Sequence, residues 1–152
     1  MEKSWRGESG YVQMVSMLSL GIIFEIEDSD FNRLVQLVER DDLNDYLIDF
    51  LINYRNKDWK QTDKFLWNKP YKSIAEIVAL SEENKSKALE RLSNYLPGWY
   101  KSLETKTHES KWNIHTGYWC WEAGALVKIL GLDDSSLKDQ QYYPYDMVHW
   151  KD

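Results

Sequence analysis

The sequence predicts an all-α protein that folds as one compact multi-helix bundle. Apolar residues recur at intervals of three and four over most of the chain, which is the period of an amphipathic helix. Val, Ile and Thr are not gathered into the alternating runs that mark strands. At 152 residues, of which 43% are hydrophobic, the chain has the size of one domain with a substantial core. We therefore expect residues 1–152 to form a single helical domain.

Three helices are predicted in the N-terminal third of the chain. The first covers about residues 9–27, and the third covers about residues 42–54. Ser29 or Asp30 can cap the second helix, because both side chains accept a hydrogen bond from a free helical N–H. The inward positions of the first helix are Val12, Val15, Leu18, Ile22 and Ile26.

A loop is predicted over residues 55–71, which lose the helical period and end near a proline. A short helix is expected over residues 73–80. Ser81 is then a good cap for another helix, which runs to Pro97 and Gly98 and resumes after a kink.

The C-terminal third is predicted to contain a polar linker and one long helix. The linker covers residues 104–111, and the helix covers about residues 112–130. Gly131 is a natural stop, because glycine readily adopts the left-handed conformation that ends helices. Within this helix, residues 119–130 are expected to lie in the core.

The charge distribution limits the possible partners. The net charge is −6 and the isoelectric point is near 5.1, which argues against direct binding of nucleic acid. Residues 25–49 carry nine acids and two arginines, a local charge of −7, whereas residues 55–72 have a local charge of +4. The acids either form solvated helix faces or present an acidic face to a basic partner.

The termini and the single cysteine favour a cytoplasmic protein. The opening "MEKSWRGESG" has no apolar segment after its charges, so it does not resemble a signal peptide. The longest apolar run, residues 12–24, is interrupted by serines and a glycine and is too short to span a membrane. One cysteine excludes an internal disulfide. No membrane association is expected, and the oligomeric state is left open.

No catalytic group, metal site or cofactor site is predicted. Cys120 lies between two tryptophans, and His115 is about 140° away around a helix, so we expect a buried thiol rather than a nucleophile. His108, His115 and His149 lack the spacing of metal ligands, although a site built from His115 and Glu122 stays conceivable. The glycines form no phosphate-binding motif.

Glu122 is the acid that most needs an explanation. It shares a helical stripe with apolar residues, and a carboxylate there is costly unless it is hydrogen-bonded. We interpret it as part of a structural polar cluster in which a tyrosine, an indole or an arginine donates to it. Two alternatives stay open, namely a small helical enzyme with a Glu122-centred pocket and a generic helical adaptor.

One long motif carries a resemblance to a known family. The segment "GYWCWEAGALVKILGLDDSSLKDQQYYPYD" resembles the C-terminal domain of the PoNi-type immunity proteins. The segments "GYVQMVSMLSLGIIFEIEDSDFNRLVQLV" and "YLIDFLINYR" are also similar, so the resemblance covers about residues 10–148. Family members often carry a preceding helical domain, and the sequence leaves open whether residues 1–152 are a short member or part of a longer one. The motif positions are Tyr118, Trp119, Trp121, Glu122, Gly131, Asp133, Asp134 and Pro144.

The resemblance implies an all-α cytoplasmic protein that protects a bacterium from a secreted toxin. Toxins of this kind are typically nucleases, delivered by type VI secretion or by contact-dependent systems. The immunity protein binds the toxin C-terminal domain tightly and is not an enzyme. The resemblance also implies that specificity lies outside the shared motif, and we expect it in residues 39–72.

Two regions are candidates for the toxin-binding surface. A nuclease presents Lys and Arg to a phosphate backbone, so exposed acids and aromatics suit its surface. The first region contributes Asp41, Asp42, Asp45 and Asp49, which we expect to be solvated. The second contributes Asp139, Tyr142, Tyr143 and Asp146, of which the first three are expected to be exposed. In the second region Asp133 or Asp134 also caps a short helix, and Pro144 fixes an extended turn.

Overall fold

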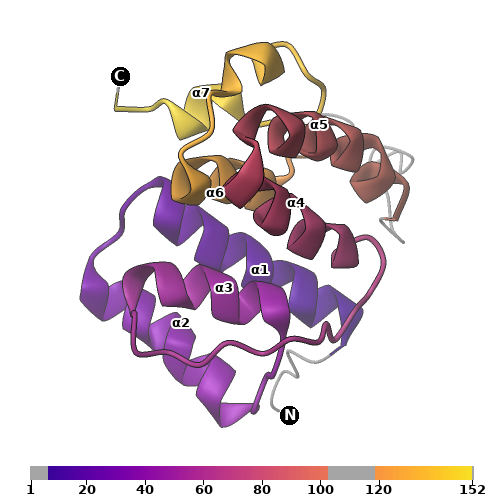
Figure 1. The fold of residues 1–152 in the computed structure, drawn as a ribbon. Helices are drawn as coiled ribbons and strands as arrows, with labels where there is room; N and C mark the ends of the chain where they lie inside the picture. Colours follow the sequence, from indigo (N-terminus) through magenta and orange to yellow (C-terminus); the bar gives the residue numbers. More distant parts are fainter. Residues whose placement is uncertain (1–6, 103–118, 152) are drawn as a thin grey trace, which may run out of the picture.

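A computed structural model describes residues 7–102 and 119–151, and these residues form helices joined by loops, without a strand (Figure 1). The predicted all-α fold is therefore confirmed. In chain order the elements are α1 (Glu8–Ile23), α2 (Asp28–Arg40), α3 (Tyr46–Arg55), α4 (Lys72–Glu83), α5 (Lys85–Ser102), α6 (Trp121–Leu130), the 3-10 helix η2 (Asp134–Leu137) and α7 (Tyr145–Val148). In these described residues, no helix combines the length and the apolar character needed to cross a bilayer.

Helix α1 is the centre of the bundle. It packs against α2 and α3 on one side and against α6 on the other, while α4 and α5 form a tightly packed pair (Figure 1). In this pair α4 contacts α3, and α5 is joined to α6 by the hydrogen bond between Tyr95 and Glu122. Side chains on opposite sides of α1 are buried, since Met14 and Ile23, each with 0% exposure, lie about 180° apart around the helix. A helix that is apolar on most sides is stable only when neighbours cover it, which explains its central position.

The N-terminal helices differ from the predicted ones at their ends. Helix α1 ends at Ile23, four residues early, because Glu25 adopts a left-handed conformation with φ of 53°. Helix α2 begins at Asp28 after Glu27, so the predicted caps at Ser29 and Asp30 were wrong. Asp30 instead lies in the first turn, where a negative charge stabilises the free N–H groups of the helix.

The loop over residues 56–71 is confirmed and includes a cis peptide bond between Lys69 and Pro70. Helix α4 continues through Ser81, whose hydroxyl donates to the Val78 carbonyl oxygen at 2.6 Å, so Ser81 is not a cap. The break falls at Asn84, whose side-chain oxygen accepts from the Lys87 N–H at 3.2 Å. Helix α5 then continues through Pro97 to Ser102.

The C-terminal helix α6 is shorter than predicted among the described residues. Trp119 and Cys120 precede it, while residues 112–118 and the predicted linker over residues 104–111 lie outside the described part of the chain. Trp119 is 39% exposed, so its assignment to the core was wrong. Gly131 ends α6 with φ of 65°, as predicted.

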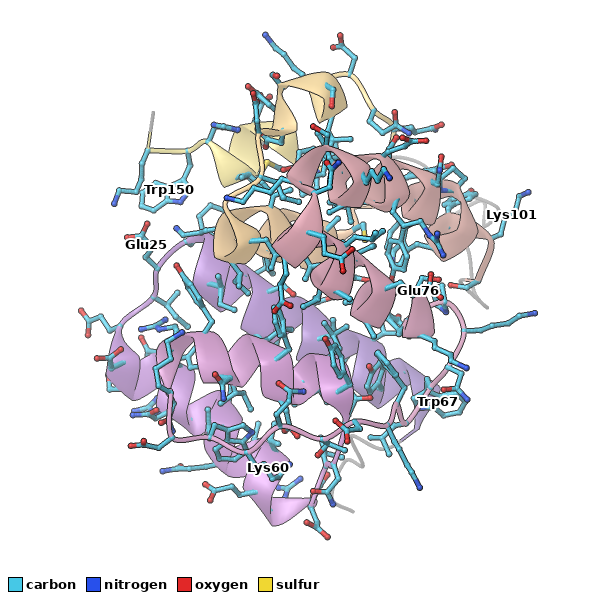
Figure 2. All side chains as sticks on the ribbon, in the orientation of Figure 1. Glu25, Lys60, Trp67, Glu76, Lys101 and Trp150 are labelled. Atoms are coloured by element: carbon cyan, nitrogen blue, oxygen red, sulfur yellow. The ribbon has the colours of Figure 1, made fainter. Side chains whose placement is uncertain are left out.

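The end of the chain is fastened to the end of α1. The Trp150 indole N–H donates to the Ile23 carbonyl oxygen at 2.7 Å. Glu25 accepts from Lys128 at 2.6 Å and from Lys151 at 3.1 Å. Figure 2 shows Glu25 and Trp150 side by side at this edge of the molecule. These contacts fix the C-terminal segment against the N-terminal helices.

Candidate functional site

A groove of about 410 Å³ lies between the end of α2 and the loop that follows α3. We call it the α2–loop groove. Its floor is apolar, its rim carries three carboxylates, and one wall is an indole ring. The lining residues are Val38, Glu39, Asp42, Leu43, Asp58, Trp59 and Lys60. Lys60 marks its position in Figure 2, on the loop that runs back along α3.

Asp45 attaches the far end of this loop to α3. It is the N-cap of α3 and accepts from the Ile48 N–H at 2.9 Å. Its side chain also accepts from the Leu66 N–H at 2.8 Å and from the Tyr11 hydroxyl at 2.9 Å. The residue is 0% exposed, so the expectation that it is solvated was wrong. Burial raises the pKa of this carboxyl group, although the three donors stabilise its charged form.

Asp49 attaches the near end of the loop from one helical turn further along α3. Its carboxylate accepts from the Trp59 indole N–H at 2.8 Å, from Lys60 Nζ at 2.9 and 3.0 Å, and from the Thr62 N–H at 2.9 Å. Asp49 is also 0% exposed, contrary to the expectation. Asp45 and Asp49 both face the loop that crosses α3. This loop brings N–H groups that are shielded from water, and the two carboxylates accept their hydrogen bonds.

The remaining acids of the first candidate region divide between the groove and its margin. Asp42 is exposed and lines the α2–loop groove, with a left-handed φ of 51° and a contact from Asn44 Nδ2 at 3.3 Å. Asp41 is half-buried and accepts from Arg40 Nε at 3.0 Å, outside the groove lining. Of the four acids of this region, Asp42 is the one that lines the groove.

A second groove of about 290 Å³ lies in the C-terminal motif, between Trp119 and residues 138–147. We call it the C-terminal groove. It brings together three of the candidate residues, namely the exposed Asp139 and Asp146 and the half-buried Tyr142. The Tyr142 ring stacks on Tyr100 at 4.5 Å. The two ends of the motif meet here, since the Cys120 N–H donates to the Tyr142 carbonyl oxygen at 2.8 Å.

Tyr143 also lines this groove, but it is only 2% exposed, so its expected exposure was wrong. Its hydroxyl donates to Asp134 Oδ2 at 2.6 Å, and burial raises the pKa of this hydroxyl. Asp134 is buried and also contacts His149 Nε2 at 2.8 Å. Asp133 is the cap of η2, accepting from the Ser135 N–H at 3.1 Å, and buried Pro144 precedes α7. These motif residues hold the C-terminal segment together.

Glu122 lies in the first turn of α6 and is 3% exposed. The Tyr95 hydroxyl donates to Glu122 Oε2 at 3.0 Å, which agrees with the structural polar cluster expected from the sequence. Burial raises the pKa of Glu122, and it also raises the pKa of the fully buried Cys120. Glu122 lines neither groove. Trp121, its neighbour in the motif, is half-buried, and Tyr118 lies outside the described residues.

No group of three or more His, Cys, Asp or Glu side chains within residues 7–102 and 119–151 could hold a metal ion. His108 and His115 lie outside these ranges, and so, with His115, does one half of the conceivable site that it would form with Glu122. His149 contacts Asp134 instead.

Sequence reasoning missed Asp58 and Trp59 as site candidates. Both line the α2–loop groove and lie within the stretch where specificity was expected, but neither was singled out, whereas Glu39 belongs to the acidic group over residues 39–49. The sequence contained one signal for this site, namely a tryptophan in the polar loop segment "NKDWKQ". A tryptophan that packs outside a helix usually needs a hydrogen-bond partner for its indole N–H.

Comparison with protein families supplies the identity of the domain. The family model for PoNe immunity proteins (PoNi), C-terminal, matches residues 43–147. No curated protein and no solved structure matched the chain. The matched residues include α3, which holds the groove loop, and the C-terminal motif from Trp119 to Asp146. The chain therefore belongs to the family of PoNe immunity proteins, whose C-terminal domain model residues 43–147 match.

Proposed function

We propose that this protein binds a cognate toxin domain in the bacterial cytoplasm and neutralises it by covering its functional surface. The family match over residues 43–147 is the observation that carries the proposal. We further propose that the toxin is a nuclease with a basic surface and that the immunity protein works without catalysis.

The surface chemistry of the chain supports this partner. A nuclease that binds a phosphate backbone carries Lys and Arg at its active site. Both grooves combine exposed carboxylates with aromatic rings, which supply fast association and tight contacts respectively. With a net charge of −6, the chain attracts a basic partner over a distance of about a Debye length, roughly 8 Å at physiological salt.

The direct test pairs this protein with the toxin domain encoded by the neighbouring gene. Cells that express the toxin alone should stop growing, and coexpression of this chain should restore growth. A catalytically inactive toxin variant should copurify with the chain at a fixed stoichiometry. If coexpression gives no protection and the two proteins elute separately, the proposal is wrong.

An enzymatic function centred on Glu122 has no comparable support. Its carboxyl group is buried, bonded to Tyr95, and absent from the lining of both grooves.

A further inference from the structure

The indole wall of the α2–loop groove is held in place at several points. The Trp59 indole N–H donates to buried Asp49 at 2.8 Å. The Trp59 main-chain N–H donates to the Asn56 carbonyl oxygen at 3.0 Å, and its own carbonyl oxygen accepts from Asn53 Nδ2 at 2.8 Å. A ring fixed in this way loses little conformational freedom when a partner binds, which is typical of residues that dominate interface energies.

The groove is strongly acidic once its internal ion pair is taken into account. Glu39, Asp42 and Asp58, which we call the groove carboxylates, are all exposed. Lys60 is the base among the lining residues, but its ammonium group contacts both oxygens of buried Asp49 and lies 5.5 Å from the centre of the Trp59 ring, so a cation already occupies a site beside this indole. Three negative charges therefore face an apolar floor and an aromatic ring.

We propose that the α2–loop groove receives an arginine-bearing loop of the toxin. The guanidinium would lie between the Trp59 ring and the groove carboxylates. Its planar fork stacks on aromatic faces and donates paired hydrogen bonds to carboxylates, whereas a lysine ammonium is a compact point charge. The methylene stem would cover the apolar floor. A volume of about 410 Å³ lies within the range of pockets that enclose small ligands, roughly 300–1,000 Å³.

This inference rests on the proposed function, because it names the contact that the toxin makes. The first experiment measures the affinity of the inactive toxin domain encoded by the neighbouring gene for two triple variants. The groove variant is Glu39→Gln/Asp42→Asn/Asp58→Asn, in which Asn at position 42 tolerates the left-handed backbone. The matched control, Glu82→Gln/Glu83→Gln/Glu90→Gln, removes the same charge from exposed positions of α4 and α5.

The groove variant should bind the toxin at least about 100-fold more weakly than the parent, since close charge pairs across an interface have large coupling energies. The control should stay within about threefold, because its charges act only through long-range steering. Equal losses in both variants, or no loss in the groove variant, would overturn the groove assignment while leaving the immunity function intact.

A second experiment needs no toxin. Acetyl-arginine amide and acetyl-lysine amide are titrated into the protein while the Trp59 indole N–H signal is followed by NMR, with Trp59→Phe used for assignment. The arginine probe should shift this signal with saturation in the millimolar range, more tightly than the lysine probe, and the shift should vanish in the groove variant. Absence of the shift, or equal binding of both probes, refutes the inference even if the toxin binds. Failure of the toxin to bind the parent refutes the proposed function instead.

Discussion

Removing the Asp49 carboxylate should detach the groove loop from α3. In the Asp49→Ala variant, three donors lose their shared acceptor, namely the Trp59 indole N–H, the Thr62 N–H and Lys60 Nζ. A hydrogen bond to a charged acceptor contributes about 1.5–3 kcal/mol net, so the two N–H donors account for most of the loss. The lysine contributes less than its geometry suggests, because its side chain is 46% exposed and water replaces the lost contact. The free energy of unfolding should therefore fall by about 3–6 kcal/mol.

Chemical denaturation of matched variants checks this magnitude. Asp49→Asn keeps one acceptor oxygen and should lose about half as much free energy of unfolding as Asp49→Ala. Asp63→Ala, an exposed acid in the same loop, should stay within about 0.5 kcal/mol of the parent. A double-mutant cycle between Asp49→Ala and Trp59→Phe should give a coupling energy of about 0.5–3 kcal/mol.

The reasoning would be refuted by an Asp49→Ala protein as stable as the Asp63→Ala control. A vanishing coupling energy with Trp59→Phe would contradict the indole contact specifically. Stability loss with unchanged toxin affinity would show that the loop is held for folding alone and that its wall of the groove is not used.

Three further predictions concern α6 and the glycines. Burial raises the pKa of Glu122 above its ordinary 4.5, so the folded state keeps a proton that the unfolded state loses as pH rises. The stability advantage of the parent over Glu122→Gln, measured as the difference in free energy of unfolding, should therefore fall as pH rises above 4.5. A difference that stays constant from about pH 5 to 8 would contradict this. Cys120 should react with a bulky disulfide reagent only under unfolding conditions, and fast labelling of the native protein would remove its buried assignment. In a thermal unfolding assay, Gly131→Ala should lower the free energy of unfolding by about 1 kcal/mol, because the backbone φ at this position is 65°. Gly98→Ala should instead raise it by about 0.5–1 kcal/mol, because Gly98 lies in α5 with open space around it.

The fold class was predictable from sequence because helical periodicity is a repeated signal. Gly131 was predictable for a different reason, since a glycine after an apolar helix meets a specific backbone requirement. The predictions that Ser29 and Ser81 cap helices were wrong because both residues lie inside helices: α2 already begins at Asp28, and α4 continues to Glu83. Local cap preference is worth about 1 kcal/mol and yields to packing of whole helices.

The site was predictable only in part, because exposure depends on which segments meet. Asp42 and Asp45 look alike in the sequence, yet Asp42 is at the surface and Asp45 is fully buried. The difference comes from residues far away in the chain, since Tyr11 and Leu66 supply two of the Asp45 donors. Tyr142 and Tyr143 differ in the same way, because Asp134 accepts from Tyr143. No periodicity within one segment encodes such contacts.

The acidic stretch over residues 25–49 therefore has two uses that the total charge conceals. Some of its acids form ion pairs within the protein: Asp49 with Lys60, and Asp28 with Arg55 at 2.6 Å. Lys60 and Arg55 belong to the basic stretch over residues 55–72, so this stretch, with a local charge of +4, contacts the acidic stretch, with a local charge of −7. The internal pairs fix the loop beside α2, and the same loop contributes Asp58 and Trp59 to the groove. Glu39 and Asp42, two of the acids of this stretch that stay exposed, line the groove where we propose that the toxin binds.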